Sequence, residues 1–81
     1  MPRYYFHLYN RIGSSDDGEG RDLASLDVAQ AAAIKDIRSI LGEEVRQGSV
    51  DLTGRIEIVD AAGARLLTVP FADAVELRLP G

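Results

Sequence analysis

Residues 26–47 read LDVAQAAAIKDIRSILGEEVRQ, and this stretch decides the fold. Its apolar residues recur with the period of an α-helix, so it predicts one long amphipathic helix. The side predicted to face the core consists of Leu26, Ala29, Ala33, Ile37, Ile40, Leu41 and Glu44, with Ile34 and Val45 on its shoulder. The opposite side is expected to face water and carries Lys35, Arg38, Ser39, Gly42 and Arg46. A helix with one apolar stripe packs against one further layer, which the rest of the chain must supply.

Both ends of the predicted helix carry capping signals. Ser25 is the expected N-cap, and Asp27 in the first turn complements the helix dipole. Asp27 paired with Gln30 is the alternative capping box. At the other end, Gly48 suits the left-handed conformation that stops a helix.

The layer under the helix is predicted to be a mainly antiparallel sheet that begins with a strand over residues 3–10. Alternation along this strand places three side chains on the helix side, namely Tyr4, Phe6 and Leu8. The other face receives Tyr5, His7 and Tyr9, whose polar atoms tolerate water. Residues 10–20 are too polar to contribute to a core and are predicted to be a loop.

Residues 54–69 predict a β-hairpin. Its turn is Asp60-Ala61-Ala62-Gly63, which fits a type I turn closed by a bulge. The patterns leave room for two further strands, at residues 20–23 and 74–79, and the second could pair with a sheet edge or with another subunit. The predicted fold is therefore one α+β domain over residues 1–81, with the order β(β)αββ(β) and one long helix on a mainly antiparallel sheet.

Composition excludes several classes of protein. The 81 residues include no cysteine, which rules out disulfides and thiolate metal sites and favours an intracellular location. Apolar runs fall short of the roughly 20 residues that cross a bilayer, and residues 1–4 lack the apolar core of a signal peptide. We therefore expect a cytoplasmic protein without membrane contact. The net charge of −4 and the scattered Lys and Arg residues disfavour nucleic acid as a partner.

The candidate chemical residues give no enzyme signature. His7 is the only histidine, and the sequence places no nucleophile or orienting group beside it. Residues 16–22 contain four carboxylates, but their spacing is not that of a calcium-binding loop, so a solvated turn is expected and cation binding stays open. The glycines at 13, 18 and 20 form no phosphate-binding motif. We expect a non-catalytic protein without a cofactor.

The sheet face away from the helix is the remaining candidate site. Tyr5, His7, Tyr9 and Val59 are predicted to lie on it as a partner-binding surface. Aromatic residues on an open sheet can stack RNA bases, but the acidic net charge favours contact with another protein or a second copy of the chain.

Several stretches resemble one small bacterial family. These are MPRYYFHL at residues 1–8, DGEG at 17–20, LDVA at 26–29, GRIEI at 54–58 and LTVPFADAV at 67–75. Together they are similar to a domain of unknown function, DUF6894, over nearly the whole chain. The resemblance implies a bacterial cytoplasmic protein and brings no activity or functional residues with it.

The aromatic strand, the acidic glycine-containing loop and the alanine-rich helix are also similar, more distantly, to the start of HicB-like antitoxin domains. That resemblance implies a regulatory domain that binds a toxin or nucleic acid. It is the alternative to our leading hypothesis, a protein-contact or homodimerisation module.

Overall fold

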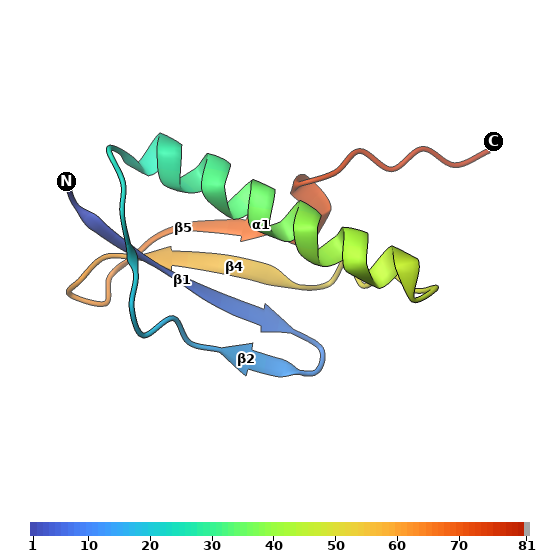
Figure 1. Ribbon diagram of the computed structural model, residues 1–81, viewed down its shortest axis with the longest axis horizontal. Coiled ribbons are helices and arrows are strands. Elements are labelled where there is room, and N and C mark those ends of the chain that lie inside the picture. The colour runs from blue at the N-terminus through green and yellow to red at the C-terminus, as the bar shows by residue number, and fades with distance from the viewer. Residues whose placement is uncertain (81) are drawn as a thin grey trace.

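The computed structural model describes residues 1–80 and contains one helix across one side of a mainly antiparallel sheet (Figure 1). The elements are β1 Arg3–Asn10, β2 Gly13–Ser15, β3 Arg21–Asp22, α1 Leu26–Arg46, β4 Arg55–Val59, β5 Arg65–Pro70 and the short 3-10 helix η1 Phe71–Asp73. This architecture confirms the predicted two-layer α+β class. Within residues 1–80, no helix is both long and apolar enough to cross a membrane.

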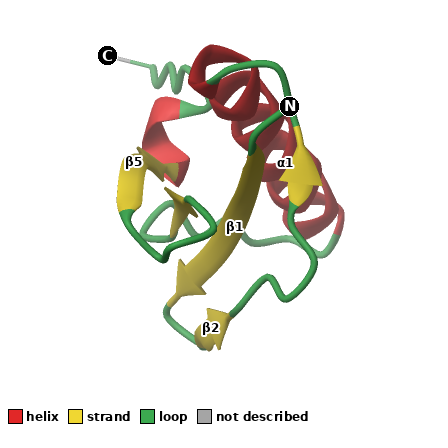
Figure 2. Cartoon of the chain, turned by 90° about the vertical axis from the view of Figure 1, so that its left-hand side faces the viewer, coloured by secondary structure: helices red, strands yellow, loops and turns green. Residues whose placement is uncertain are grey.

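β1 lies inside the sheet, whose order is β2-β1-β4-β5, and β3 pairs with the other end of β1 (Figure 2). β2 and β3 form one interrupted edge of the sheet. Leu8 pairs with Ser15 and Tyr4 pairs with Arg21. Between these two pairs, β1 spans four residue steps, whereas the segment from β2 to β3 spans six. The two additional residues make the loop over residues 16–20 bulge away from the ladder.

The helix begins where the sequence predicts. The hydroxyl of Ser25 accepts the backbone N–H of Val28 at 3.2 Å, so Ser25 is the N-cap. α1 ends one residue earlier than predicted, with Gln47 as the C-cap, and Gly48 has the left-handed φ of +92° that stops the helix.

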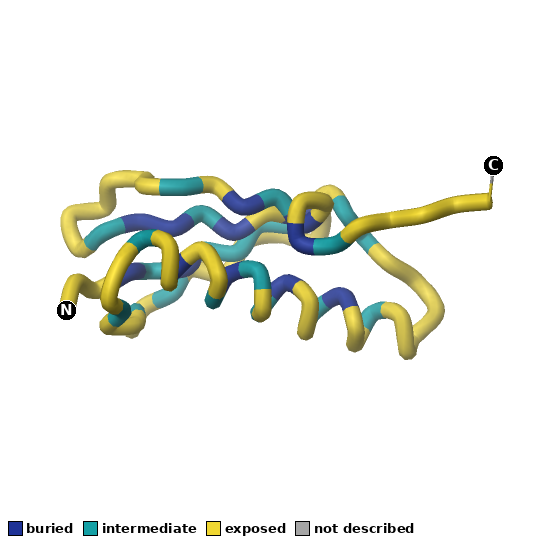
Figure 3. Tube along the Cα trace, turned by 90° about the horizontal axis from the view of Figure 1, so that it is seen from above, coloured by how far each residue is buried: buried dark blue, intermediate teal, exposed yellow. Residues whose placement is uncertain are grey.

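The core lies between α1 and the sheet. The helix buries Ala29, Ala33, Ile37 and Leu41, and the strands bury Tyr4, Phe6, Ile56, Ile58 and Val69 against them. Seen along the chain, buried positions alternate on the strands and recur once per turn on α1 (Figure 3). Val45, predicted on the shoulder of the stripe, is 60% exposed because it lies in the last turn of the helix.

The hairpin turn has the predicted chemistry. Gly63 donates its backbone N–H to the carbonyl of Asp60 at 3.0 Å and has a φ of +85°. The carboxylate of Asp60 accepts the N–H groups of Ala62 and Ala64, each at 2.9 Å. The expected bulge follows, as a register shift beside Val59. The predicted hairpin at 54–69 thus has its strands at 55–59 and 65–70.

Two sequence predictions need correction. Residues 10–20 are not all loop, because Gly13–Ser15 form β2 through backbone pairing that their small polar side chains do not signal. Residues 74–79 form no strand, and within residues 1–80 no strand of the sheet pairs with them. The tail instead extends away from the body (Figure 1). The short strand foreseen at 20–23 is present as β3.

Candidate functional site

The sheet face away from α1, which we call the open face, gathers the residues that the sequence places there. In the β1–β4 ladder, Tyr5 lies opposite Val59, His7 opposite Glu57 and Tyr9 opposite Arg55. Directly paired residues of an antiparallel ladder share one face. The open face therefore includes Tyr5, His7, Tyr9, Arg55, Glu57 and Val59, and it continues on β5 with Arg65 and Thr68, which pair with Val59 and Glu57.

Burial on the open face is greater than its lack of a helix suggests. Val59 is only 8% exposed, although it does not belong to the core cluster beneath α1. Tyr5, His7 and Tyr9 are half-buried. These rings are therefore only partly accessible to solvent, and each presents part of its surface to a partner.

Charged groups on the open face are paired. The Nε of Arg55 donates to Glu57 Oε2 at 2.8 Å, and a nitrogen of Arg65 lies 3.9 Å from the same oxygen. The guanidinium carbon of Arg55 also lies 4.4 Å from the centre of the Tyr9 ring, a cation–π distance. The sequence did not indicate this contribution of Arg55 to the face.

His7 has a structural contact. The backbone N–H of Asp17 donates to His7 Nδ1 at 3.0 Å, so this nitrogen holds the 16–20 loop against β1. The nearest carboxylate oxygen, from Asp16, lies 4.0 Å from the same nitrogen. A general base needs a free nitrogen aimed at a proton donor, and Nδ1 is already in use.

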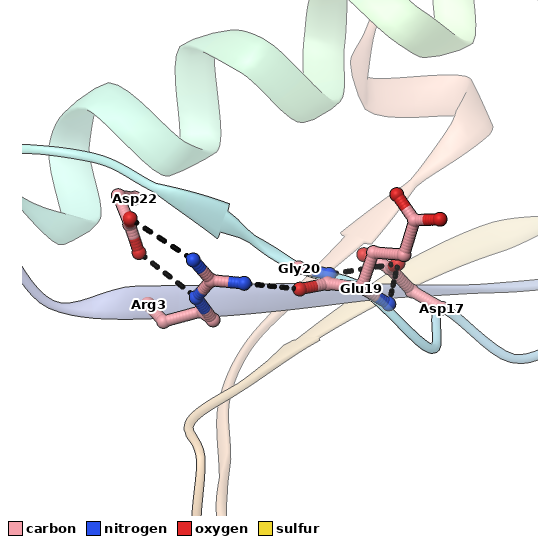
Figure 4. Close-up of polar contacts among 5 residues, drawn as sticks. All are labelled: Arg3, Asp17, Glu19, Gly20 and Asp22. Carbon is pink, nitrogen blue, oxygen red and sulfur yellow. Dashed lines mark hydrogen bonds and ion pairs between the residues drawn. The ribbon is translucent and has the colours of Figure 1, made fainter.

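The acidic loop is organised around Asp17. One carboxylate oxygen accepts the N–H groups of Glu19 and Gly20 (Figure 4). The other accepts the N–H of Phe6 at 3.1 Å. Burial alone would raise the pKa of Asp17, but the hydrogen bonds from Gly20, Phe6 and Glu19, with the charge of Arg21, outweigh it and lower the pKa below its ordinary value.

The carboxylate of Asp22, in β3, also makes an internal contact. Arg3 donates to both oxygens of Asp22, at 2.9 and 3.0 Å, and to the carbonyl of Glu19 at 2.7 Å (Figure 4). The hydrogen bond from Arg3 to Asp22, with the charge of that carboxylate, raises the pKa of Arg3. In the part of the chain that the structure describes, no group of three or more metal-binding side chains could hold an ion.

A groove of about 610 Å³, which sequence reasoning missed, lies beside the helix. Its apolar lining is Phe6, Leu8, Ile40 and Ile56, and its acidic rim is Asp16, Asp17, Glu19 and Asp36. It exists because α1 packs mainly on β4 and β5 and leaves the β1–β2 side of the sheet less covered. The dimensions of the predicted elements could have indicated this groove. One helix is about 10 Å wide and cannot cover four strands that lie nearly 5 Å apart.

Arg21 bridges one end of this groove. Its Nη2 lies 2.5 Å from Asp36 Oδ2, and its guanidinium carbon lies 4.5 Å from the centre of the Phe6 ring. The contact ties the edge of the sheet to α1, so the loop, the edge strand and the helix form one connected unit.

Among curated proteins and among solved structures, nothing matches this chain. A family model described as "Domain of unknown function (DUF6894)" matches residues 3–72, which include every strand, the helix and the 16–20 loop. The chain therefore belongs to the DUF6894 family.

Proposed function

We propose that the chain is a non-catalytic protein-interaction module of the bacterial cytoplasm, and that the open face is its contact surface. The observation that supports this is the row of three ring side chains on β1, set beside Arg55 and Glu57 on a face without a covering helix. Tyr and Arg are enriched at protein interfaces because each combines a large contact area with hydrogen-bonding groups.

The first partner to test is a second copy of the chain. Arg55 and Glu57 carry opposite charges two residues apart on the same strand. In a two-fold interface the same surface meets itself, so each charge can lie near its opposite in the other copy. Half-buried rings also lose less side-chain entropy on binding than fully exposed ones, because partial burial already limits their rotamers.

The test is the mass of the double variant Tyr5→Ser/Tyr9→Ser by light scattering over a concentration series. We expect a dimer for the wild type and a monomer for the variant, with thermal unfolding recorded to show that both are folded. Arg55→Glu is the second variant, since its exposed side chain carries no core contact. Lys35→Glu on the water-facing side of α1 is the control and should leave the mass unchanged. A monomeric wild type, or a variant that keeps the wild-type mass, rejects self-association through this face.

The runner-up is an HicB-like regulatory domain that binds a toxin or nucleic acid. The observation in its favour is that Arg55 and Arg65 lie on the same face as Tyr9, a combination that single-stranded nucleic acids stack on. Against it stands Glu57, which pairs with both arginines, and the net charge of −4. Fluorescence anisotropy at low salt with single-stranded RNA and duplex DNA tests this, and a flat titration rejects the nucleic-acid branch.

A further inference from the structure

The outer edge of β5 has backbone groups without a strand partner. Phe71 donates its N–H to the carbonyl of Gly54 at 2.9 Å. Because hydrogen-bonded and non-hydrogen-bonded pairs alternate along an antiparallel ladder, this contact shows which β5 residues bond to β4. Val69 and Leu67 then direct their backbone groups at β4, and Thr68 directs its N–H and C=O outward. β5 is the last strand of the sheet order, and within residues 1–80 no strand pairs with this edge.

The tail at residues 74–80 has the pattern of a strand, but within residues 1–80 it pairs with no strand. Leu77 is 65% and Leu79 is 76% exposed, and they alternate with Glu76 and Arg78. Arg78 forms its ion pair with Glu76 inside the same segment. The side chains of this segment alternate between apolar and charged. Adding it to the edge of a sheet would pair its backbone groups and bury its two exposed leucines.

The chain's own β5 is not the edge that this tail can reach. Phe71 and Ala74 are each 1% exposed in the core, and Arg38 of α1 donates to the carbonyl of Ala74 at 2.7 Å. These contacts fix the direction in which the tail leaves, which is away from the body and onward from the end of β5 (Figure 1). An edge that pairs with this tail would therefore belong to another molecule.

We propose that the tail of one copy pairs antiparallel with the outer edge of β5 in a second copy, and that the exchange is reciprocal in a two-fold dimer. This contact uses the edge of the sheet and is the alternative to the open face as the interface between two copies. The variants of each surface therefore distinguish the two proposals. Reciprocal exchange also covers both free edges at once, which removes the exposed backbone groups that promote aggregation.

One register satisfies both the apolar and the charged residues of the tail. Placing Leu77 of the second copy beside Val69 puts Leu79 beside Leu67, on the helix side where both β5 residues pack against the core. The same register puts Arg78 of the second copy beside Thr68, which lies opposite Glu57 in the next strand. The arginine then has a carboxylate within reach of its long side chain.

The first experiment measures mass by sedimentation over a concentration series in the full chain. Leu77→Asp/Leu79→Asp changes two exposed residues, and Thr68→Pro removes an outward N–H that β4 does not use. We expect a dimer for the wild type and monomers for both variants. Val45→Asp, which changes another exposed apolar residue, is the matched control and should stay dimeric. A monomeric wild type, or a dimer that persists in the tail variant, overturns the proposal.

The second experiment tests the register. The sequence has no cysteine, so Thr68→Cys/Arg78→Cys should form disulfide-linked dimers on mild oxidation, whereas Thr68→Cys/Glu76→Cys should do so at least several-fold less. Equal cross-linking in both variants overturns the register. A dimer that is lost in Tyr5→Ser/Tyr9→Ser but kept in the tail variant supports the open face and rejects strand exchange. A dimer that is kept in Tyr5→Ser/Tyr9→Ser but lost in the tail variant supports strand exchange and rejects the open face.

Discussion

The carboxylate of Asp17 accepts the backbone N–H of Phe6 at 3.1 Å, across the gap where the edge of the sheet is interrupted. Without this contact, the N–H of Phe6 would face a bulging loop instead of a paired strand. Asp17 thus replaces a ladder hydrogen bond with a side-chain one, while its own N–H bonds to His7. The 16–20 loop thus supplies, through Asp17, the hydrogen bond that a continuous edge strand would make with Phe6.

We predict that Asp17 makes stability depend on pH. Its pKa is lowered in the folded chain, so its contribution is fully present above the unfolded pKa of about 4 and is lost as the pH falls through the folded value. Asp17→Asn keeps the acceptor for Gly20 but turns an amide N–H toward Phe6, at a cost of about 1–3 kcal/mol at neutral pH. Urea unfolding between about pH 6 and pH 3 should show a shallower pH dependence in the variant.

The control for that experiment is Asp16→Asn. The Asp16 side chain is 82% exposed, so the variant should follow the wild-type curve. Parallel pH dependences for wild type and Asp17→Asn would show that the carboxylate of Asp17 is not the group that couples protonation to folding.

The tautomer of His7 is a second prediction. Since Nδ1 accepts the N–H of Asp17, the neutral ring must carry its proton on Nε2. Nitrogen NMR of the ring should show Nδ1 as the unprotonated atom and Nε2 as the protonated one. Asp17→Pro, which removes the donor, should allow both tautomers. A wild-type ring protonated on Nδ1 would contradict the contact.

Arg21 should contribute more to stability than its ion-pair partner. Asp36→Ala removes one partly exposed ion pair, worth up to about 1 kcal/mol. Arg21→Ala removes the same pair and also the contact with the Phe6 ring, which adds about 0.5–1 kcal/mol. Chemical denaturation measures both, and Arg46→Ala, which breaks an exposed pair with Glu43, is the control with a cost near zero. Equal costs for Arg21→Ala and Asp36→Ala would mean that the stacking contributes nothing.

The features that could be predicted from the sequence are those whose signals are local. The caps of α1 and the turn at 60–63 depend on residues within a few positions of one another, and β1 carries its own alternation. β2 was missed because it exists only through the backbone of β1, which offers an unpaired edge. The strand pattern at 74–79 is present in the sequence, but a pattern forms a strand only beside a partner.

The same reasoning applies to the candidate site. Alternation correctly placed Tyr5, His7 and Tyr9 on one face, since side-chain direction along a strand is a local property. It could not give the contacts of the 16–20 loop and of the groove beside α1. Asp17 is 11 residues from Phe6, and Arg21 is 15 residues from Asp36. Such pairings depend on the length of the bulge, which no local pattern encodes.

Gly54 should tolerate no side chain, whereas Gly42 should accept one. A Cβ at Gly54 would lie 2.7 Å from Cε2 of Phe71 and 2.9 Å from the carbonyl oxygen of Tyr9, and the Phe71 ring is buried at 1% exposure and cannot move aside. Gly54→Ala should therefore destabilise the chain by about 1–3 kcal/mol. At Gly42 an added Cβ meets no heavy atom within 4 Å outside its own helix backbone, so Gly42→Ala should stabilise α1 by up to about 1 kcal/mol. Urea denaturation of both variants should give effects of opposite sign, and a Gly54→Ala chain as stable as the wild type would mean that Phe71 does not pack against Gly54.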